Sequence, residues 1–185
     1  MAETYLALLR AINLGQNNKI LMSDLAKVFV GLGCNKVRTY IQSGNVIFEA
    51  VPQISQRLPD LVRTEIGRRF GLQVPTILRT LREMRGVIHR NPFLKEGVEA
   101  DGLHVLFLAD RPKPAAVTSL DPDRSPPNRF VVRGKEVYLL FPLGFARNKL
   151  SSAYFDSKLG TTGTMRNWRT VTKLLELMER TSAGS

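Results

Sequence analysis

The stretch KVRTYIQSGNVIFE, residues 36–49, decides the fold of the first half of this chain. Two runs rich in β-branched and aromatic side chains, Lys36–Gln42 and Asn45–Glu49, are joined by the short connection QSGN. Gly44 and Asn45 tolerate the positive φ that tight hairpin turns need. The stretch therefore predicts two adjacent antiparallel strands.

The segments on either side of this hairpin add one strand and one helix each. Before it we expect a strand at Thr4–Arg10 and a helix at Asp24–Leu32, and after it a helix ending at Phe70 and a strand at Gln73–Arg79. In both helices apolar residues recur every three or four positions, which indicates one buried face. The order βαββαβ predicts a ferredoxin-like unit, in which two helices cover one face of a four-stranded antiparallel sheet.

The second half of the chain predicts a smaller α+β subdomain of order βαββαα, also with an antiparallel sheet. Prolines, glycines and charges after residue 88 interrupt any periodicity and mark a boundary. We expect a ferredoxin-like subdomain at 1–80, a helix and linker at 81–101 and the second subdomain at 102–185. Its expected elements are a strand at Leu103–Ala109, a helix at Pro114–Leu120, strands at Arg129–Arg133 and Val137–Phe141 turning at Gly134–Lys135, and helices at Ser151–Lys158 and Trp168–Arg180.

The composition is that of an ordinary globular protein, with 43% hydrophobic residues among 185. The first fifteen residues contain an early acid and Arg10, so they resemble neither a signal peptide nor a membrane span. The single cysteine, Cys34, has no partner for an internal disulfide, which agrees with a reducing compartment. We therefore expect a cytoplasmic protein with no membrane partner, and the sequence leaves its oligomeric state open.

The formal net charge of +11 comes from 27 basic and 16 acidic side chains, spread along the chain and not gathered in a tail. Such a charge favours association with nucleic acid or with phosphorylated ligands, through long-range attraction. The alternative is a solvated basic surface that binds no particular partner, and charge alone does not exclude it. A non-catalytic module that binds an anionic partner is the interpretation we favour.

The segment GTTGTMRNWRT, residues 160–170, is the first candidate for an anion site. Asn167 stands where a helix N-cap belongs, and helix N-termini present unpaired N–H groups that suit a phosphate or carboxylate. Hydroxyl groups and arginines gather at the same place, and a second basic segment precedes it. The predicted anion-binding residues are Arg147, Lys149, Thr161, Thr162, Thr164, Arg166, Asn167 and Arg169.

A second candidate cluster follows the first predicted strand. An arginine at the end of an apolar strand must reach solvent, pair with an acid or line a cleft. The polar loop after it supplies amide and ammonium groups. This cluster consists of Arg10, Asn13, Asn17 and Lys19.

The sequence contains few of the residues that commonly act in catalysis. The chain has two histidines, His89 and His104, and one cysteine, and it contains no metal-helix or P-loop motif. We predict no metal site and no cofactor, and no catalytic constellation assigns an enzyme class. The alternative to a binding module is a small-molecule enzyme with its site in a cleft between the subdomains, where the loops around residues 13–19 and 147–149 would converge.

Five segments form an ordered set along nearly the whole chain: YLALLRAINLGQNNKILMSDL, VRTYIQSGNVIF, NPF, VYLLFPLGFARNKL and GTTGTMRNWRTVTKLLEL. Together they resemble the domain of unknown function family 1697. The resemblance implies two α+β subdomains, the first of them ferredoxin-like, and it implies no activity.

Overall fold

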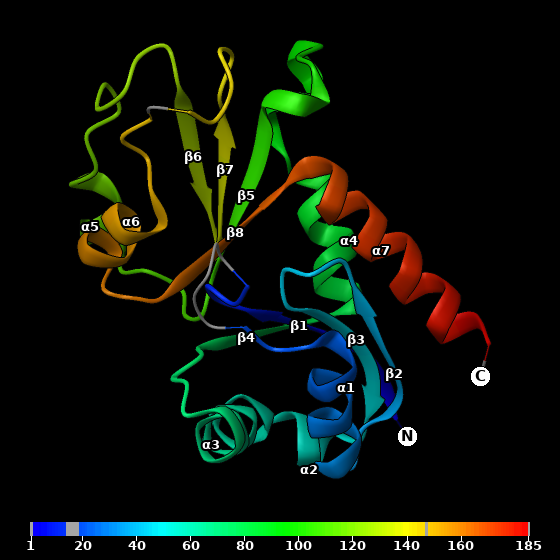
Figure 1. The fold of residues 1–185 in the computed structure, drawn as a ribbon. Coiled ribbons are helices and arrows are strands. Elements are labelled where there is room, and N and C mark those ends of the chain that lie inside the picture. The colour runs from blue at the N-terminus through cyan, green and yellow to red at the C-terminus, as the bar shows by residue number, and fades with distance from the viewer. Residues whose placement is uncertain (1, 14–18, 147, 185) are drawn as a thin grey trace. The chain divides into compact units, whose positions relative to one another are not determined.

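The computed structural model describes residues 2–13, 19–146 and 148–184, and these residues form two compact units (Figure 1). The first unit comprises Met1–Arg85 together with Leu174–Ser185, and the second comprises Gly86–Lys173. Each unit contains one four-stranded antiparallel sheet. The α+β fold class is confirmed.

The first unit has the predicted βαββαβ order and a sheet in the order β2-β3-β1-β4, which is the ferredoxin-like arrangement. Its elements are β1 (Glu3–Leu9), α1 (Met22–Gly31), β2 (Asn35–Tyr40), β3 (Asn45–Ala50), the short α2 (Pro52–Ser55), α3 (Leu58–Phe70) and β4 (Thr76–Thr80).

The predicted hairpin is present, but β2 ends at Tyr40 and the connection to β3 runs from residue 41 to residue 44. Ile41 and Gly44 both have positive φ, at 49° and 72°. The strand ends earlier than the apolar pattern suggests because Ile41 belongs to the turn, where 51% of it is exposed.

The core of the first unit lies between the sheet and its two long helices. Alternate residues of β1, Tyr5, Ala7 and Leu9, belong to one buried cluster with residues of α1 and α3, as the period-two alternation of a strand requires. Leu6 and Leu8 of the same strand are fully buried as well, so both faces of this sheet are covered.

The second unit contains one strand more than predicted. It runs β5 (Leu103–Leu108), α5 (Pro114–Thr118), β6 (Arg129–Arg133), β7 (Glu136–Leu140), α6 (Ser152–Leu159) and β8 (Gly163–Asn167), and its sheet has the order β6-β7-β5-β8. The order is therefore βαββαβ, as in the first unit, and the predicted βαββαα is corrected. Two short 3-10 turns, η1 (Pro92–Glu96) and η2 (Ala100–Gly102), precede β5.

Strand β8 occupies residues that the sequence assigned to a loop before the last helix. It is an edge strand, paired with β5 alone among the described strands, and its polar residues do not show the apolar alternation of a buried strand. The strand begins at Gly163, a residue type that suggests a loop in the sequence. A Cβ at this position would lie 2.8 Å from Leu106 Cδ1, so the glycine allows close packing there.

Each sheet leads directly from its last strand into a capped helix. Helix α4 (Leu81–His89) follows β4, and Thr80 and Glu83 form a reciprocal capping box: Thr80 Oγ1 accepts from the Glu83 N–H at 3.1 Å, and Glu83 Oε2 accepts from the Thr80 N–H at 2.8 Å. Helix α7 (Trp168–Ala183) follows β8, and Asn167 Oδ1 accepts from the Thr170 N–H at 2.8 Å. The predicted N-cap at Asn167 is confirmed.

Candidate functional site

Six of the eight predicted anion-binding residues lie along β8 and at its two ends instead of forming one loop before a helix. Thr161 and Thr162 precede the strand, Thr164 and Arg166 are part of it, Asn167 ends it, and Arg169 lies in α7. Arg147 lies outside the described residues.

The middle of this set is enclosed. Thr164 is 3% exposed and Arg166 is 9% exposed. The Arg166 Nη1 group donates to Thr164 Oγ1 and to the Met165 carbonyl oxygen, both at 2.8 Å. Burial lowers the pKa of the Arg166 guanidinium to about 10, so the group still carries its charge at neutral pH. Both of these hydrogen bonds lie within β8, and both side chains are largely shielded from solvent.

The carboxyl end of β8 opens on a small pocket of about 310 Å³, lined in part by His104, Phe145, Asn167 and Arg169. His104 stacks on Phe145, with ring centroids 5.2 Å apart and planes 25° from parallel. Burial lowers the pKa of His104 below its usual value and so favours the neutral imidazole. Arg169 Nη2 lies 2.7 Å from Asp101 Oδ1, and this carboxylate offsets the positive charge that the site would offer an anion.

Lys149 belongs to a different part of the second unit. Its N–H donates to Ser125 Oγ at 3.1 Å, and its carbonyl oxygen accepts from Arg124 Nε at 3.2 Å. These bonds fasten the segment after residue 148 to the loop that contains Ser125, and the Lys149 residue is exposed.

The amino end of β8 lies beside a basic pocket, which we define by Arg111, Lys113, Lys158 and Thr161 and which has a volume of about 370 Å³. Thr161 Oγ1 accepts a hydrogen bond from the Asp110 N–H at 3.0 Å, and this bond joins the segment before β8 to the segment after β5. The Thr162 carbonyl oxygen accepts from the Ala109 N–H at 2.8 Å and extends the same pairing.

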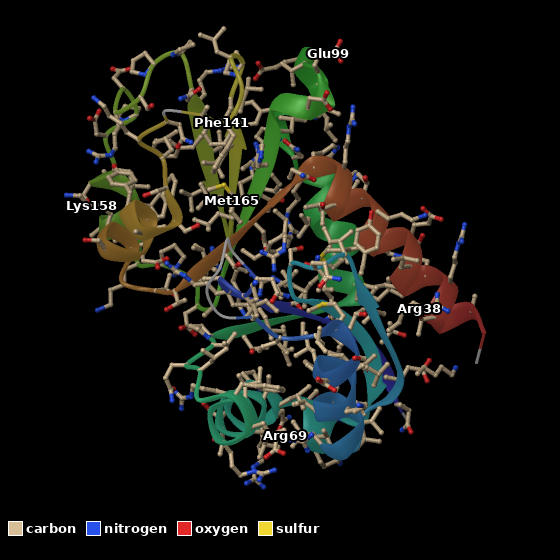
Figure 2. All side chains as sticks on the ribbon, viewed as in Figure 1. Arg38, Arg69, Glu99, Phe141, Lys158 and Met165 are labelled. Atoms are coloured by element: carbon tan, nitrogen blue, oxygen red, sulfur yellow. The ribbon has the colours of Figure 1, made fainter. Side chains whose placement is uncertain are left out.

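Helix ends place the cations of the basic pocket. Lys113 is the N-cap of α5, and Lys158 lies in the last turn of α6, which ends at Gly160 with φ of 66°. In Figure 2, Lys158 projects outward from α6. Arg111, Lys113 and Lys158 are exposed, and across the described part of the chain none of them forms an ion pair. One carboxylate, that of Asp110, also lines the pocket.

Arginines on the rest of the surface are commonly paired with acids. In the first unit the strongest case is Glu65, whose hydrogen bonds from Arg68 and Arg69 lower its pKa to about 2. The three cations of the basic pocket differ from these because no carboxylate among the described residues forms an ion pair with them. Further surface pairs include Arg63 with Asp60, Arg85 with Glu179 and Arg180 with Glu176, and the half-exposed Arg90 pairs with the buried Glu136.

In the second candidate cluster, Asn13 forms hydrogen bonds to the backbone of other segments of the first unit. Asn13 Nδ2 donates to the carbonyl oxygens of Ile20 and Gln42 at 3.0 and 2.9 Å, and Asn13 Oδ1 accepts from the Ile20 N–H at 2.8 Å. Arg10 is half-buried, and its N–H donates to the Pro75 carbonyl oxygen at 2.9 Å. Lys19 is exposed, and Asn17 lies outside the described residues.

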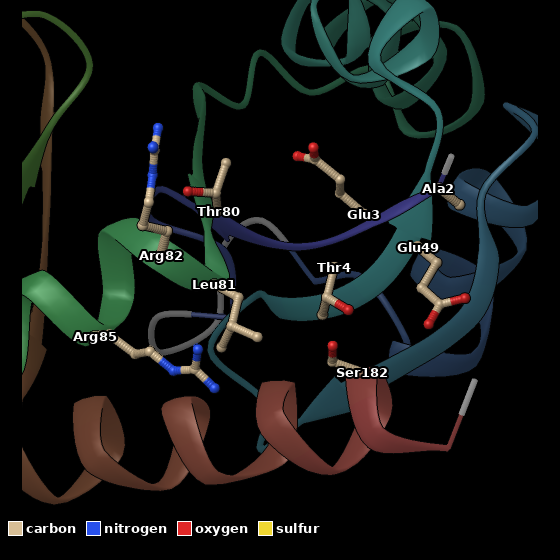
Figure 3. Close-up of a pocket in the computed structure, with 9 residues that line it drawn as sticks. All are labelled: Ala2, Glu3, Thr4, Glu49, Thr80, Leu81, Arg82, Arg85 and Ser182. Carbon is tan, nitrogen blue, oxygen red and sulfur yellow. The ribbon is translucent and has the colours of Figure 1, made fainter.

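Sequence reasoning missed a polar pocket of about 570 Å³ in the first unit (Figure 3). Glu3 and Glu49 line it from β1 and β3, and Arg82 and Arg85 line it from the first turns of α4. The Arg85 Nε group lies 2.9 Å from Glu179 Oε1, which already neutralises it. The capping-box residues Thr80 and Glu83 were the sequence signal that could have revealed this pocket. They fix the start of α4 and therefore the positions of Arg82 and Arg85.

The described residues contain no group of three or more His, Cys, Asp or Glu side chains that could hold a metal ion. None of the helices in residues 2–13, 19–146 and 148–184 has the length and hydrophobicity of a membrane span.

The fold defines a class of protein: an α+β protein with two four-stranded antiparallel sheets of identical strand order. The model of the family described as protein of unknown function (DUF1697) matches residues 2–138. This chain belongs to that family.

One solved structure has a similar fold along almost the whole chain. It is that of a conserved bacterial protein from Streptococcus pneumoniae, with a TM-score of 0.68 and 20% sequence identity over 96% of this chain and 99% of that one. At this identity the likeness shows the fold alone. No curated protein matches the sequence.

Proposed function

We propose that this protein is a non-catalytic binding module for an anionic partner, either nucleic acid or a phosphorylated ligand, and that the basic pocket of the second unit receives the anion. The observation that carries the proposal is the group of three cations, Arg111, Lys113 and Lys158, which line one hollow and have no acidic partner among the described residues.

The chemistry of the pocket suits a phosphate group. A guanidinium group offers paired N–H donors to phosphate oxygens, and ammonium groups add charge without a fixed geometry. The pocket has three positive charges against the single carboxylate of Asp110. The net charge of +11 adds long-range attraction for the same ligands.

Fluorescence anisotropy of labelled single-stranded RNA and duplex DNA, at low and at physiological salt, tests the proposal. The variant Arg111→Ala/Lys158→Ala should bind at least about tenfold more weakly. The slope of log K against the logarithm of the salt concentration should decrease by an amount that corresponds to about two phosphate contacts. The matched control is Lys27→Ala/Arg63→Ala, which removes the same charges from exposed ion pairs of the first unit.

Equal weakening in both double variants would mean that net charge acts without a defined pocket, and it would overturn the assignment of the site. If neither nucleic acid binds at low salt, titration with inorganic phosphate and a nucleoside monophosphate, followed by NMR of the backbone amides near Thr161, decides between a phosphorylated ligand and no anion at all.

A further inference from the structure

A second pocket in the same unit has the opposite character. We call it the acidic pocket: it has a volume of about 580 Å³ and lies between the segment 97–102 before β5 and the segment 140–144 after β7. The volume falls within the range of pockets that hold small molecules, which is about 300–1,000 Å³. It shares no residue with the basic pocket.

The walls of the acidic pocket are mainly apolar. Val98, Leu140, Phe141 and Pro142 line it. Phe141 packs edge-on against Phe145, with ring centroids 5.2 Å apart, and is fully buried. Phe141 therefore supports the wall of the pocket from behind, and the apolar surface that a ligand would meet comes from the half-buried Val98 and the exposed Pro142.

Backbone contacts fix the shape of the pocket before any ligand arrives. The Phe141 N–H donates to the Gly102 carbonyl oxygen at 2.8 Å, and the Gly144 N–H donates to the Phe141 carbonyl oxygen at 3.0 Å. A Cβ at Gly102 would lie 2.9 Å from the Phe141 carbonyl oxygen, so the two segments approach as closely as a glycine allows. A preformed pocket lowers the entropic cost of binding.

The rim of the pocket carries carboxylates on a protein that is otherwise strongly basic. Glu99 and Asp101 line it, and Figure 2 shows Glu99 projecting from the segment before β5. The one cation in the lining, Arg129, is paired with Glu96. Asp101 is paired with Arg169, whereas Glu99 forms no ion pair with any residue that the structure describes.

We propose that the acidic pocket binds a small organic cation with an apolar body, the chemical class of aromatic and branched alkyl amines. The apolar walls receive the body, and the Glu99 carboxylate at the rim receives the ammonium group. An anion with the same apolar body meets the Glu99 carboxylate at the rim and is rejected. This site is independent of the anion site proposed above.

The test is a titration of the full-length protein followed by NMR of its backbone amides. The probes are phenethylamine, its neutral analogue 2-phenylethanol and the anion 3-phenylpropionate. Phenethylamine should shift the Gly97, Gly102 and Gly144 amides to saturation, 2-phenylethanol should bind more weakly, and 3-phenylpropionate should leave them unmoved. Absence of a saturable shift with phenethylamine, or equal binding of 3-phenylpropionate, would overturn the proposal.

Two variants distinguish the contribution of the Glu99 charge to binding from the contribution of the shape of the pocket. Glu99→Gln should weaken phenethylamine binding about two- to fivefold, as expected for one exposed charge interaction, and leave 2-phenylethanol unchanged. Val98→Trp should fill the pocket and abolish both. The control Asp123→Asn removes an exposed carboxylate from a distant loop of the sequence and should change neither affinity. An effect of Asp123→Asn equal to that of Glu99→Gln would contradict a local carboxylate.

Discussion

Arg79 and Arg166 occupy the same position in two copies of one strand-and-helix junction. Each is the next-to-last residue of the fourth strand of its sheet, opposite Leu6 of β1 or Val105 of β5. Both are buried, and the Nη1 group of each donates at 2.8 Å to the carbonyl oxygen of the preceding residue.

The equivalence continues into the helix that follows. Residues 78–83 read LRTLRE and residues 165–170 read MRNWRT. Thr80 and Asn167 each accept a hydrogen bond from the N–H three residues later, at Glu83 and Thr170. The two sheets therefore share strand order, register and the cap that starts the next helix, as expected of two copies of one unit.

The buried arginines should stabilise the fold more than their exposed neighbours do. Arg166→Ala removes two hydrogen bonds from a buried charged group and should lower the free energy of unfolding by about 2 kcal/mol. Arg169→Ala, three residues later and exposed, should change it by less than about 0.5 kcal/mol. Urea denaturation measures both, and equal losses would show that Arg166 acts through surface charge.

The N-cap of α7 should have a measurable share in stability. Asn167→Ala leaves the Thr170 N–H without its acceptor, so it should cost about 1 kcal/mol and lower the melting temperature by about 3 °C. Asn167→Asp keeps an acceptor oxygen and adds a charge that the helix dipole favours, so it should retain full stability. Calorimetry compares the three proteins; a stable alanine variant would argue against the cap.

Two glycines with similar backbone angles should tolerate alanine differently. Gly44 and Gly71 have φ of 72° and 67°, so alanine is strained at both and should cost about 1 kcal/mol. A Cβ at Gly44 would also lie 2.8 Å from both Ile12 Cδ1 and Leu9 Cβ, whereas Gly71 has open space around it. Gly44→Ala should therefore be the more destabilising by at least about 1 kcal/mol in thermal unfolding.

Cys34 should make stability depend on alkaline pH. Burial raises the pKa of its thiol to about 11, so the folded protein holds this proton to higher pH than the unfolded chain does. The resulting stabilisation is complete below about pH 9 and is lost as the pH rises toward 11. Urea titrations from pH 8 to 11 should show a steeper decline for the natural chain than for Cys34→Ala, which keeps every other titrating group. Parallel curves would rule out this contribution.

The sequence by itself determined the elements that depend on local interactions. Turn residues at 43–45, apolar spacing in α1 and α3, and the Asn167 cap act within a few residues of the chain, and they were enough to predict the first unit and the start of α7. The composition also determined that the protein is strongly basic, with a formal net charge of +11. The sequence similarity between residues 78–83 and residues 165–170 was the signal that could have predicted a strand at β8.

Only the tertiary structure decided what β8 is and where the candidate site residues lie. Hydrogen bonds to β5, which is far earlier in the sequence, make Gly163–Asn167 a strand and bury Arg166 within it. The same pairing separates Thr161 from Arg169 and places Thr161 in the same pocket as Arg111 and Lys158. A polar edge strand has no local periodicity of its own, so its conformation and its neighbours follow from the strand that it pairs with.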